Sequence, residues 1–181
     1  EMQSAVNAIL VSVAAGAGAL GATVLVTLND ITTEAFIGEE VTKADAAGGT
    51  GSGAIYTNGN IIVKSTQTAD TLNIVSAITV GAVAVTVIVD VANQRSYNYA
   101  LIRGVNIIKA KNINVEAEIK GNHARVTNVQ VGLGGIAAGC TVAVAKINTV
   151  NRAIVELYDS GTLEAKNLTI TDLLPEETKS Q

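Results

Sequence analysis

Val83-Ala-Val-Thr-Val-Ile-Val-Asp-Val91 has a valine at every second position. Successive side chains of a β-strand point to opposite faces, so this alternation is a strand pattern and not a helical one. Three of the four residues between the valines, Ala84, Thr86 and Ile88, are themselves apolar or nearly so, and the fourth is Asp90. This composition predicts a flank of the protein that is covered or meets a partner.

Similar runs occur at residues 22–28 and 140–145, and the features that follow the three runs recur in the same order. Each run is followed by an alanine that precedes two apolar residues, and then by an alternating strand that begins with asparagine. The alanines are Ala35, Ala100 and Ala153, and the asparagines are Asn60, Asn112 and Asn167. Self-similarity at a long period is the signature of repeat architectures. We therefore divide the chain into blocks of about 55 residues, roughly 16–80, 81–134 and 135–174.

The predicted fold is all-β, a parallel β-helix (β-solenoid) built from about three imperfect composite repeats. A coil of such a fold takes on the order of 20–30 residues, so each block is expected to hold two or more coils. The strand at 112–120 predicts one core face, with Ile113 and Val115, and one wet face, with Glu116 and Glu118. We treat 1–181 as a single segment of a longer chain, with a surface-loop insertion at 46–53 and a polar tail at 175–181.

The first block carries a family resemblance. A Val/Thr run is followed by Thr33-Glu-Ala-Phe-Ile-Gly38, a Gly-rich turn and Asn60-Ile-Ile-Val-Lys64. This combination resembles the repeats of large leukotoxin-like filamentous adhesins of fusobacteria and related anaerobes, over nearly the whole chain. The resemblance implies an extended β-helix in a cell-surface or secreted exoprotein, an autotransporter-like passenger with a role in virulence. It implies contact with a host or bacterial surface protein or glycan, and it transfers no catalytic residue.

The composition excludes several classes of protein. Charged residues are 15% of the chain and hydrophobic residues 48%, which excludes a disordered chain. The net charge is −4 and no Lys/Arg cluster occurs, so no nucleic acid partner is expected. Three uncharged stretches, 5–29, 71–89 and 126–145, have the length of a membrane span. Their strand period and their Gly, Asn, Gln and Thr residues predict no membrane span.

Several short motifs are candidates for chemical sites. Gly16-Ala-Gly-Ala-Leu-Gly21 matches half of a dinucleotide fingerprint, but a β-branched alternating run follows where a helix should begin. We interpret it as a tight turn. The pairs Glu39–Glu40 and Glu116–Glu118 could support acid/base chemistry on a glycan, yet lysines flank the second pair and predict solvated carboxylates. His123 is expected in an exposed turn, and Cys140 is expected to be a small buried residue.

Tyr97 and Tyr99 share a strand face and form a candidate surface-contact pair. No catalytic, metal or cofactor site is predicted, and the chain is not expected to be an enzyme. The predicted function is a structural and adhesive segment located outside the cell or on its outer surface. The alternatives are a self-assembling filament or shell protein, and a carbohydrate-active β-helix enzyme. End-to-end or lateral self-association is expected if the ends of the stack are bare.

Overall fold

The computed structural model describes residues 1–38, 53–175 and 179–180, and in these residues it contains strands and no helix. The insertion proposed at 46–53 and the Glu39–Glu40 pair lie outside the described residues, apart from Gly53, and so does part of the polar tail. The strands are β1 (Met2–Ala15), β2 (Gly18–Gly38), β3 (Gly53–Tyr56), β4 (Asn60–Val80), β5 (Val83–Leu133), β6 (Ile136–Leu173) and β7 (Lys179–Ser180).

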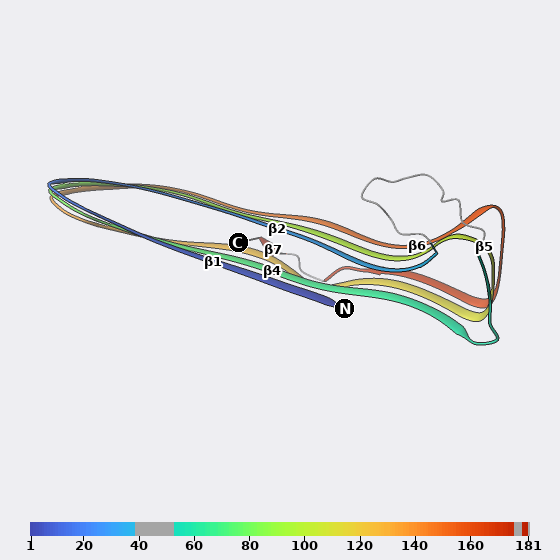
Figure 1. Ribbon diagram of the computed structural model, residues 1–181. Coiled ribbons are helices and arrows are strands. Elements are labelled where there is room, and N and C mark those ends of the chain that lie inside the picture. Colours follow the sequence, from blue (N-terminus) through green and yellow to red (C-terminus); the bar gives the residue numbers. More distant parts are fainter. Residues whose placement is uncertain (39–52, 176–178, 181) are drawn as a thin grey trace.

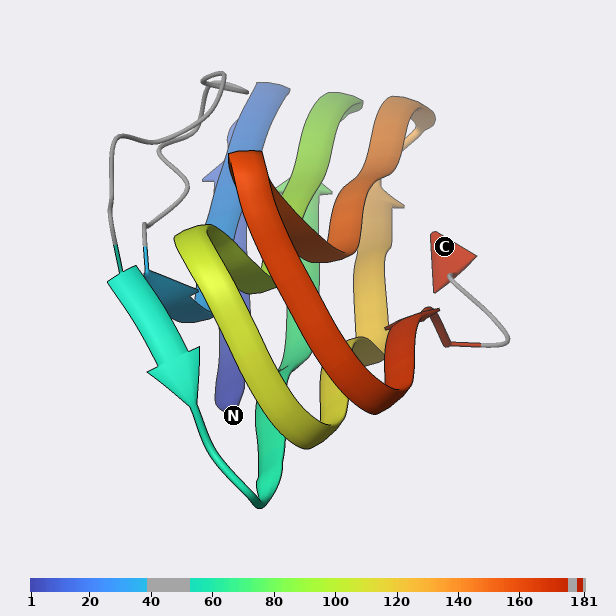
Figure 2. The ribbon, with the colours of Figure 1, turned by 90° about the vertical axis from the view of Figure 1, so that its right-hand side faces the viewer.

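All strand pairs are parallel and belong to one curled sheet. The chain runs alternately through two layers. One layer contains β1, β4, the second half of β5 and the end of β6, and the other contains β2, the first half of β5 and the first part of β6. Figure 1 shows the two layers converging toward one narrow end, and Figure 2 shows the strands side by side within each layer. The all-β, parallel-strand part of the prediction is confirmed.

The residues aligned as equivalent in the three blocks are direct neighbours in the sheet. Ala100 pairs with Ala35 on one side and with Ala153 on the other. Asn112 likewise lies between Asn60 and Asn167. One block therefore adds one strand to each layer, which is a single turn of the chain. The expectation of two or more coils per block is wrong. The reason is strand length, because β2 and β4 are 21 residues long and one passage through both layers uses a whole block.

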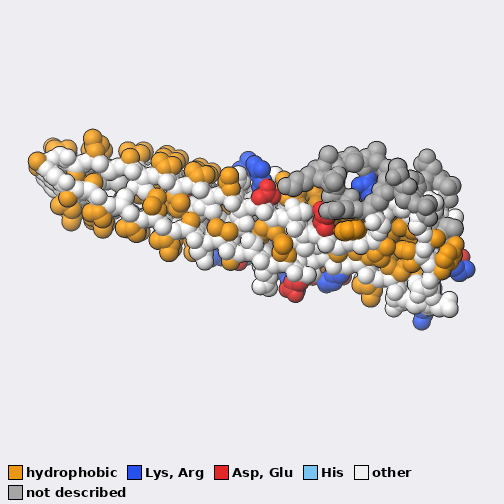
Figure 3. Space-filling model, viewed as in Figure 1, with side chains coloured by type: hydrophobic (Ala, Val, Ile, Leu, Met, Phe, Trp, Pro, Cys, Tyr) orange, Lys and Arg blue, Asp and Glu red, His pale blue; other side chains and the backbone are white. Residues whose placement is uncertain are grey.

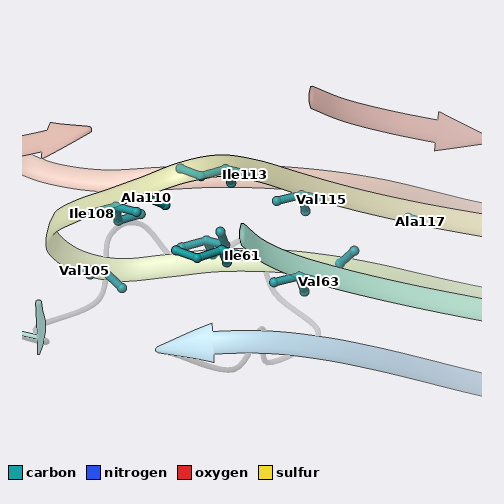
Figure 4. Close-up of a cluster of buried hydrophobic side chains, with 10 residues drawn as sticks. Ile61, Val63, Val105, Ile108, Ala110, Ile113, Val115 and Ala117 are labelled. Atoms are coloured by element: carbon teal, nitrogen blue, oxygen red, sulfur yellow. The ribbon is translucent and has the colours of Figure 1, made fainter. Parts of the chain in front are cut away.

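A hydrophobic core fills the wide end, where the two layers are farthest apart (Figure 4). Its side chains come from both layers and from the corner that joins them. The buried members are Ile61, Val63, Ala100, Ile102, Val105, Ile108, Ala110, Ile113, Val115 and Ala117. Glu116 and Glu118 point to the outer face of the same strand and are partly exposed. The two faces predicted for this strand are confirmed.

The narrow end, which we call the arm, consists of the three uncharged stretches 5–29, 71–89 and 126–145. Its layers lie so close together that hydroxyl groups of facing strands form hydrogen bonds. Thr79 and Thr86 are joined at 2.7 Å, and Ser12 and Thr23 at 2.5 Å. Threonines and serines therefore share the inside of the arm with a small hydrophobic cluster around Val75 and Ile88, while Val83 and Val87 point outward and are 44% and 39% exposed. No helix in the described part of the chain is long and apolar enough to cross a membrane.

Candidate functional site

The Gly16–Gly21 motif lies at the tip of the arm and comprises the turn at Gly16 and Ala17 and the first residues of β2. β1 ends at Ala15, the chain turns, and β2 begins at Gly18. The turn is stacked on the equivalent turn of the second block, because the backbone N–H of Gly16 donates to the carbonyl of Val80 at 3.0 Å. A dinucleotide fingerprint requires a helix after the glycines, and a strand follows here. The interpretation as a tight turn is confirmed.

The carboxylates of Glu116 and Glu118 are held by one ammonium group. Lys64 Nζ lies 2.6 Å from Glu116 Oε1 and 3.1 Å from Glu118 Oε2. The hydrogen bonds to Glu116 and then Glu118 raise the pKa of Lys64. Lys64 and Glu116 are lateral neighbours on β4 and β5, so the strand register produces this contact. Both carboxylates are thus engaged in ion pairs with a single lysine on the outer face of the sheet.

His123 lies within β5 and not in a turn, so its predicted location is wrong. The register between β4 and β5 shifts at Gln67 and Thr68, and this irregularity lets the strand continue through Gly121 and Asn122. His123 Nδ1 lies 2.7 Å from Asp70 Oδ1, on the neighbouring strand. Among the described residues no group of three or more His, Cys, Asp or Glu side chains could hold a metal ion.

Cys140 is exposed, so the prediction of a buried thiol is wrong. It pairs with Val87, whose side chain points outward, and it lies on β6. In this part of the arm β6 has β5 on one side and no described strand on the other. The residue therefore lacks the cover that a third strand would provide.

Tyr97 and Tyr99 lie on the outer face of β5, and both are half-buried. Tyr97 has Thr32 and Val150 as its lateral neighbours, and Tyr99 lies between Glu34 and Arg152. The structure thus places the pair on one outer face and flanks it with residues of both neighbouring strands. Its role in surface contact stays a prediction.

The outer faces of the arm carry no charged side chain and many exposed apolar ones. Figure 3 shows hydrophobic side chains along both sides of the arm and charged side chains at the wide part. In the layer that contains β2, Val89 lies between Val24 and Val142, which are 63% and 48% exposed. Further exposed members are Ile9, Val11, Val13, Leu20, Val26, Leu28, Ile78, Val80, Val83, Val87, Val129, Val131, Leu133, Ile136 and Val144. Contiguous apolar surface on this scale is typical of contact with other molecules.

A groove of about 450 Å³ lies at the corner of the wide end. Three segments that are far apart in the sequence contribute its lining, which consists of Thr57, Asn58, Lys109, Ala110, Lys111, Glu164, Ala165 and Lys166. No motif predicts this groove, since each of its three segments contains at most two lysines. The only available signal was the repeat alignment, which sets Lys111 and Lys166 one residue before Asn112 and Asn167.

Comparison of the chain with protein-family models, with curated proteins and with solved structures found no match.

Proposed function

We propose that the chain is a structural and adhesive segment of a large bacterial exoprotein, folded as a parallel β-helix with one coil per block. In this proposal it is located on the outer cell surface or secreted. It acts by making many contacts with a host or bacterial surface protein or glycan along a rigid body. The proposed relation to leukotoxin-like filamentous adhesins rests on the motifs at Thr33–Gly38 and Asn60–Lys64.

The register of the repeats is the observation that carries this proposal. Equivalent alanines and asparagines of successive blocks are lateral neighbours, so each block places equivalent residues at the same positions of the two layers. A stack of this kind can be extended by adding further blocks, and each new block contacts only the previous one. Such a body holds identical surface features at regular intervals, which favours multivalent attachment.

The composition of the outer surface supports a contact role over catalysis. The arm is apolar on both faces, and the carboxylates with the best spacing for acid/base work are engaged by Lys64. The buried centres of protein interfaces are more apolar than the rest of the surface, and aromatic side chains are enriched there. Tyr97 and Tyr99, together with the Val24–Val89–Val142 row, are the features that we assign to contact.

The proposal is tested by attachment of protein-coated beads to cultured epithelial cells and to bacterial cells. Wild-type beads should attach, and soluble chain should compete for the attachment. The double variant Tyr97→Ser/Tyr99→Ser should reduce attachment, while Tyr56→Ser, which removes another exposed tyrosine, should not. Circular dichroism of each variant establishes that the strands are retained. Absence of attachment to every cell type tested would contradict the adhesive function.

Self-assembly is a second candidate, favoured by the two open edges of the sheet. Among the described strands β1 pairs with β4 alone and β2 with β5 alone, which leaves one edge of each strand unpaired. β6 leaves a second edge at the opposite side of the stack. Unpaired edges of parallel strands can accept another copy in the same register. Sedimentation velocity distinguishes the two functions, because assembly requires concentration-dependent oligomers that Val13→Lys on edge strand β1 should weaken.

A further inference from the structure

The corner groove contains two adjacent lysines that form no ion pair with another described residue. Ala110 pairs with Ala165 and Asn112 with Asn167, so Lys111 and Lys166 lie side by side on neighbouring strands. Strands in a sheet are about 4.8 Å apart, and like charges at this spacing repel each other. Within the described residues neither lysine has an ion pair within 4.0 Å. An anion held between the two ammonium groups would relieve this repulsion.

On the other rim of the groove, the charge of the lysine is neutralised by a glutamate. Lys109 Nζ lies 3.0 Å from Glu164 Oε2, and this pair bridges the same two strands. The excess positive charge is therefore concentrated on the Lys111–Lys166 side. A short anionic ligand fits this arrangement, because it can place one charged group between the two lysines.

The end of the groove supplies neutral hydrogen-bonding groups. Thr57 Oγ1 accepts a hydrogen bond from the backbone N–H of Gly59 at 3.0 Å, so its hydroxyl proton is free to be donated. Asn58 is exposed and contributes an amide that can both donate and accept. Next to the lysines, the amides of Asn60, Asn112 and Asn167 are joined in a row at 2.7 and 2.8 Å. Hydroxyls and amides of this kind complement the hydroxyl groups of a sugar.

We propose that the groove binds an anionic saccharide, whose carboxylate or sulfate lies between Lys111 and Lys166 and whose hydroxyls contact Thr57 and Asn58. The volume of about 450 Å³ lies within the range of pockets that bind small molecules. This inference rests on the proposed adhesive function, and it names the chemical class of the glycan that is recognised. Carboxylated and sulfated sugars share the relevant chemistry, and the experiment separates them.

The test is calorimetric titration of the protein with a sulfated heparin-derived tetrasaccharide, with tetragalacturonate and with neutral cellotetraose. At least one of the two anionic sugars should bind saturably, and cellotetraose should bind more weakly. The double variant Lys111→Gln/Lys166→Gln should weaken binding about tenfold or more. The variant Lys120→Gln/Lys146→Gln removes the same charge elsewhere and should leave the affinity within about twofold.

A further variant distinguishes loss of the anion site from misfolding. Lys166→Glu places an opposite charge beside Lys111, so the strands should be retained while the anion site is lost. Equal losses in the two double variants would show that binding is non-specific attraction, and this would overturn the inference. Failure of both anionic sugars to bind would do the same.

The bead assay separates this inference from the proposed function. If beads attach to cells but neither anionic sugar binds, the groove has no such role and the adhesive function stands on other surfaces. If a sugar binds through the lysines but beads attach to no cell, the adhesive function fails and the saccharide site remains.

Discussion

Gly134 lies beside Gly81 at the tip of the arm, and a β-carbon added to Gly134 would stand 1.8 Å from the carbonyl oxygen of Gly81. The two glycines belong to equivalent turns at the two ends of the second block, and the backbone N–H of Gly81 donates to the carbonyl of Leu133 at 2.9 Å. The turns are therefore stacked so closely that a side chain has no room between them. This contact explains why the tips of the repeats carry glycine.

Gly134→Ala should destabilise the protein, because the clash is with backbone that cannot move without breaking the stacked turns. We expect a loss of at least about 1–3 kcal/mol in the free energy of unfolding, measured by urea denaturation. Gly18→Ala is the matched control, since an added β-carbon there has no atom within 4 Å. The control should stay within about 0.5 kcal/mol of wild type. Equal stability of the two variants would disprove the stacking of the turns.

Ile113→Ala should cost about 2–5 kcal/mol, because the side chain is 1% exposed and lies in the core of the wide end. Ile62→Ala removes the same atoms from a side chain that is 66% exposed on β4, and it should change stability by less than about 0.5 kcal/mol. Chemical denaturation of both variants measures the difference. Similar losses would mean that the inner and outer faces of these strands are assigned wrongly.

Asn98→Ala should weaken the connection between the two layers. The buried Asn98 amide donates to the carbonyl of Glu118 at 3.1 Å and to Asn151 Oδ1 at 2.8 Å, and its oxygen accepts from Ser65. Leaving these buried groups without a partner should cost about 1–3 kcal/mol. Asn112→Ala removes a solvent-accessible amide that water can replace, so it should cost less than about 1 kcal/mol. The midpoint of thermal unfolding ranks the two variants, and a larger shift for Asn112 would contradict this assignment.

Asp90→Asn should stabilise the protein at neutral pH. Burial raises the pKa of the Asp90 carboxyl, and a hydrogen bond from Asn73 at 2.8 Å opposes that rise in part. Because the folded state favours the protonated form, the ionised carboxylate lowers stability at pH values above its folded-state pKa. This cost disappears as the pH falls through that pKa toward the ordinary value of about 3.9.

The urea midpoint of Asp90→Asn should therefore exceed that of wild type at pH 7, and the difference should shrink as the pH approaches 4. With its nitrogen facing Asp90, the Asn128 amide donates to Asp90 Oδ2 at 2.8 Å, and by rotating it can present its oxygen to an asparagine at position 90. The variant thus keeps the hydrogen bonds of the site. A midpoint below that of wild type at pH 7 would show that the ionised form of Asp90 is favoured in the folded state.

Much of the strand structure could be predicted from the residues. The valine alternation at 83–91 is local and has the period of a strand, so it indicates a strand whatever surrounds it. The recurrence of alanine and asparagine at 35, 100 and 153 and at 60, 112 and 167 predicts parallel neighbours, because like residues stack in a repetitive sheet. The length of each passage could not be predicted in the same way, because the corner within β5 is marked only by Gly104, and an isolated glycine within a strand pattern can equally mark a bulge.

The candidate sites depended more heavily on the tertiary structure. Tyr97 and Tyr99 were found from their spacing alone, and their shared face follows from the period of two. The groove was missed, because Asn58, Lys111 and Lys166 are brought together by winding and not by proximity in the chain. The wrong expectation for Cys140 has a related origin, as hydrophobicity says nothing about whether a strand lies at the edge of a sheet.

The strand type, the parallel stacking and the low charge of the arm are properties of residue order, because each follows from side-chain period and repetition. The direction in which the arm valines point was settled only by the approach of the two layers. The inner face of this strand carries the buried Ala84, Thr86 and Ile88, and Thr86 pairs with Thr79 across the space, so the alternating valines are left on the outside. Packing between distant segments thus decided which surface the molecule presents, and residue order decided the strands from which that surface is made.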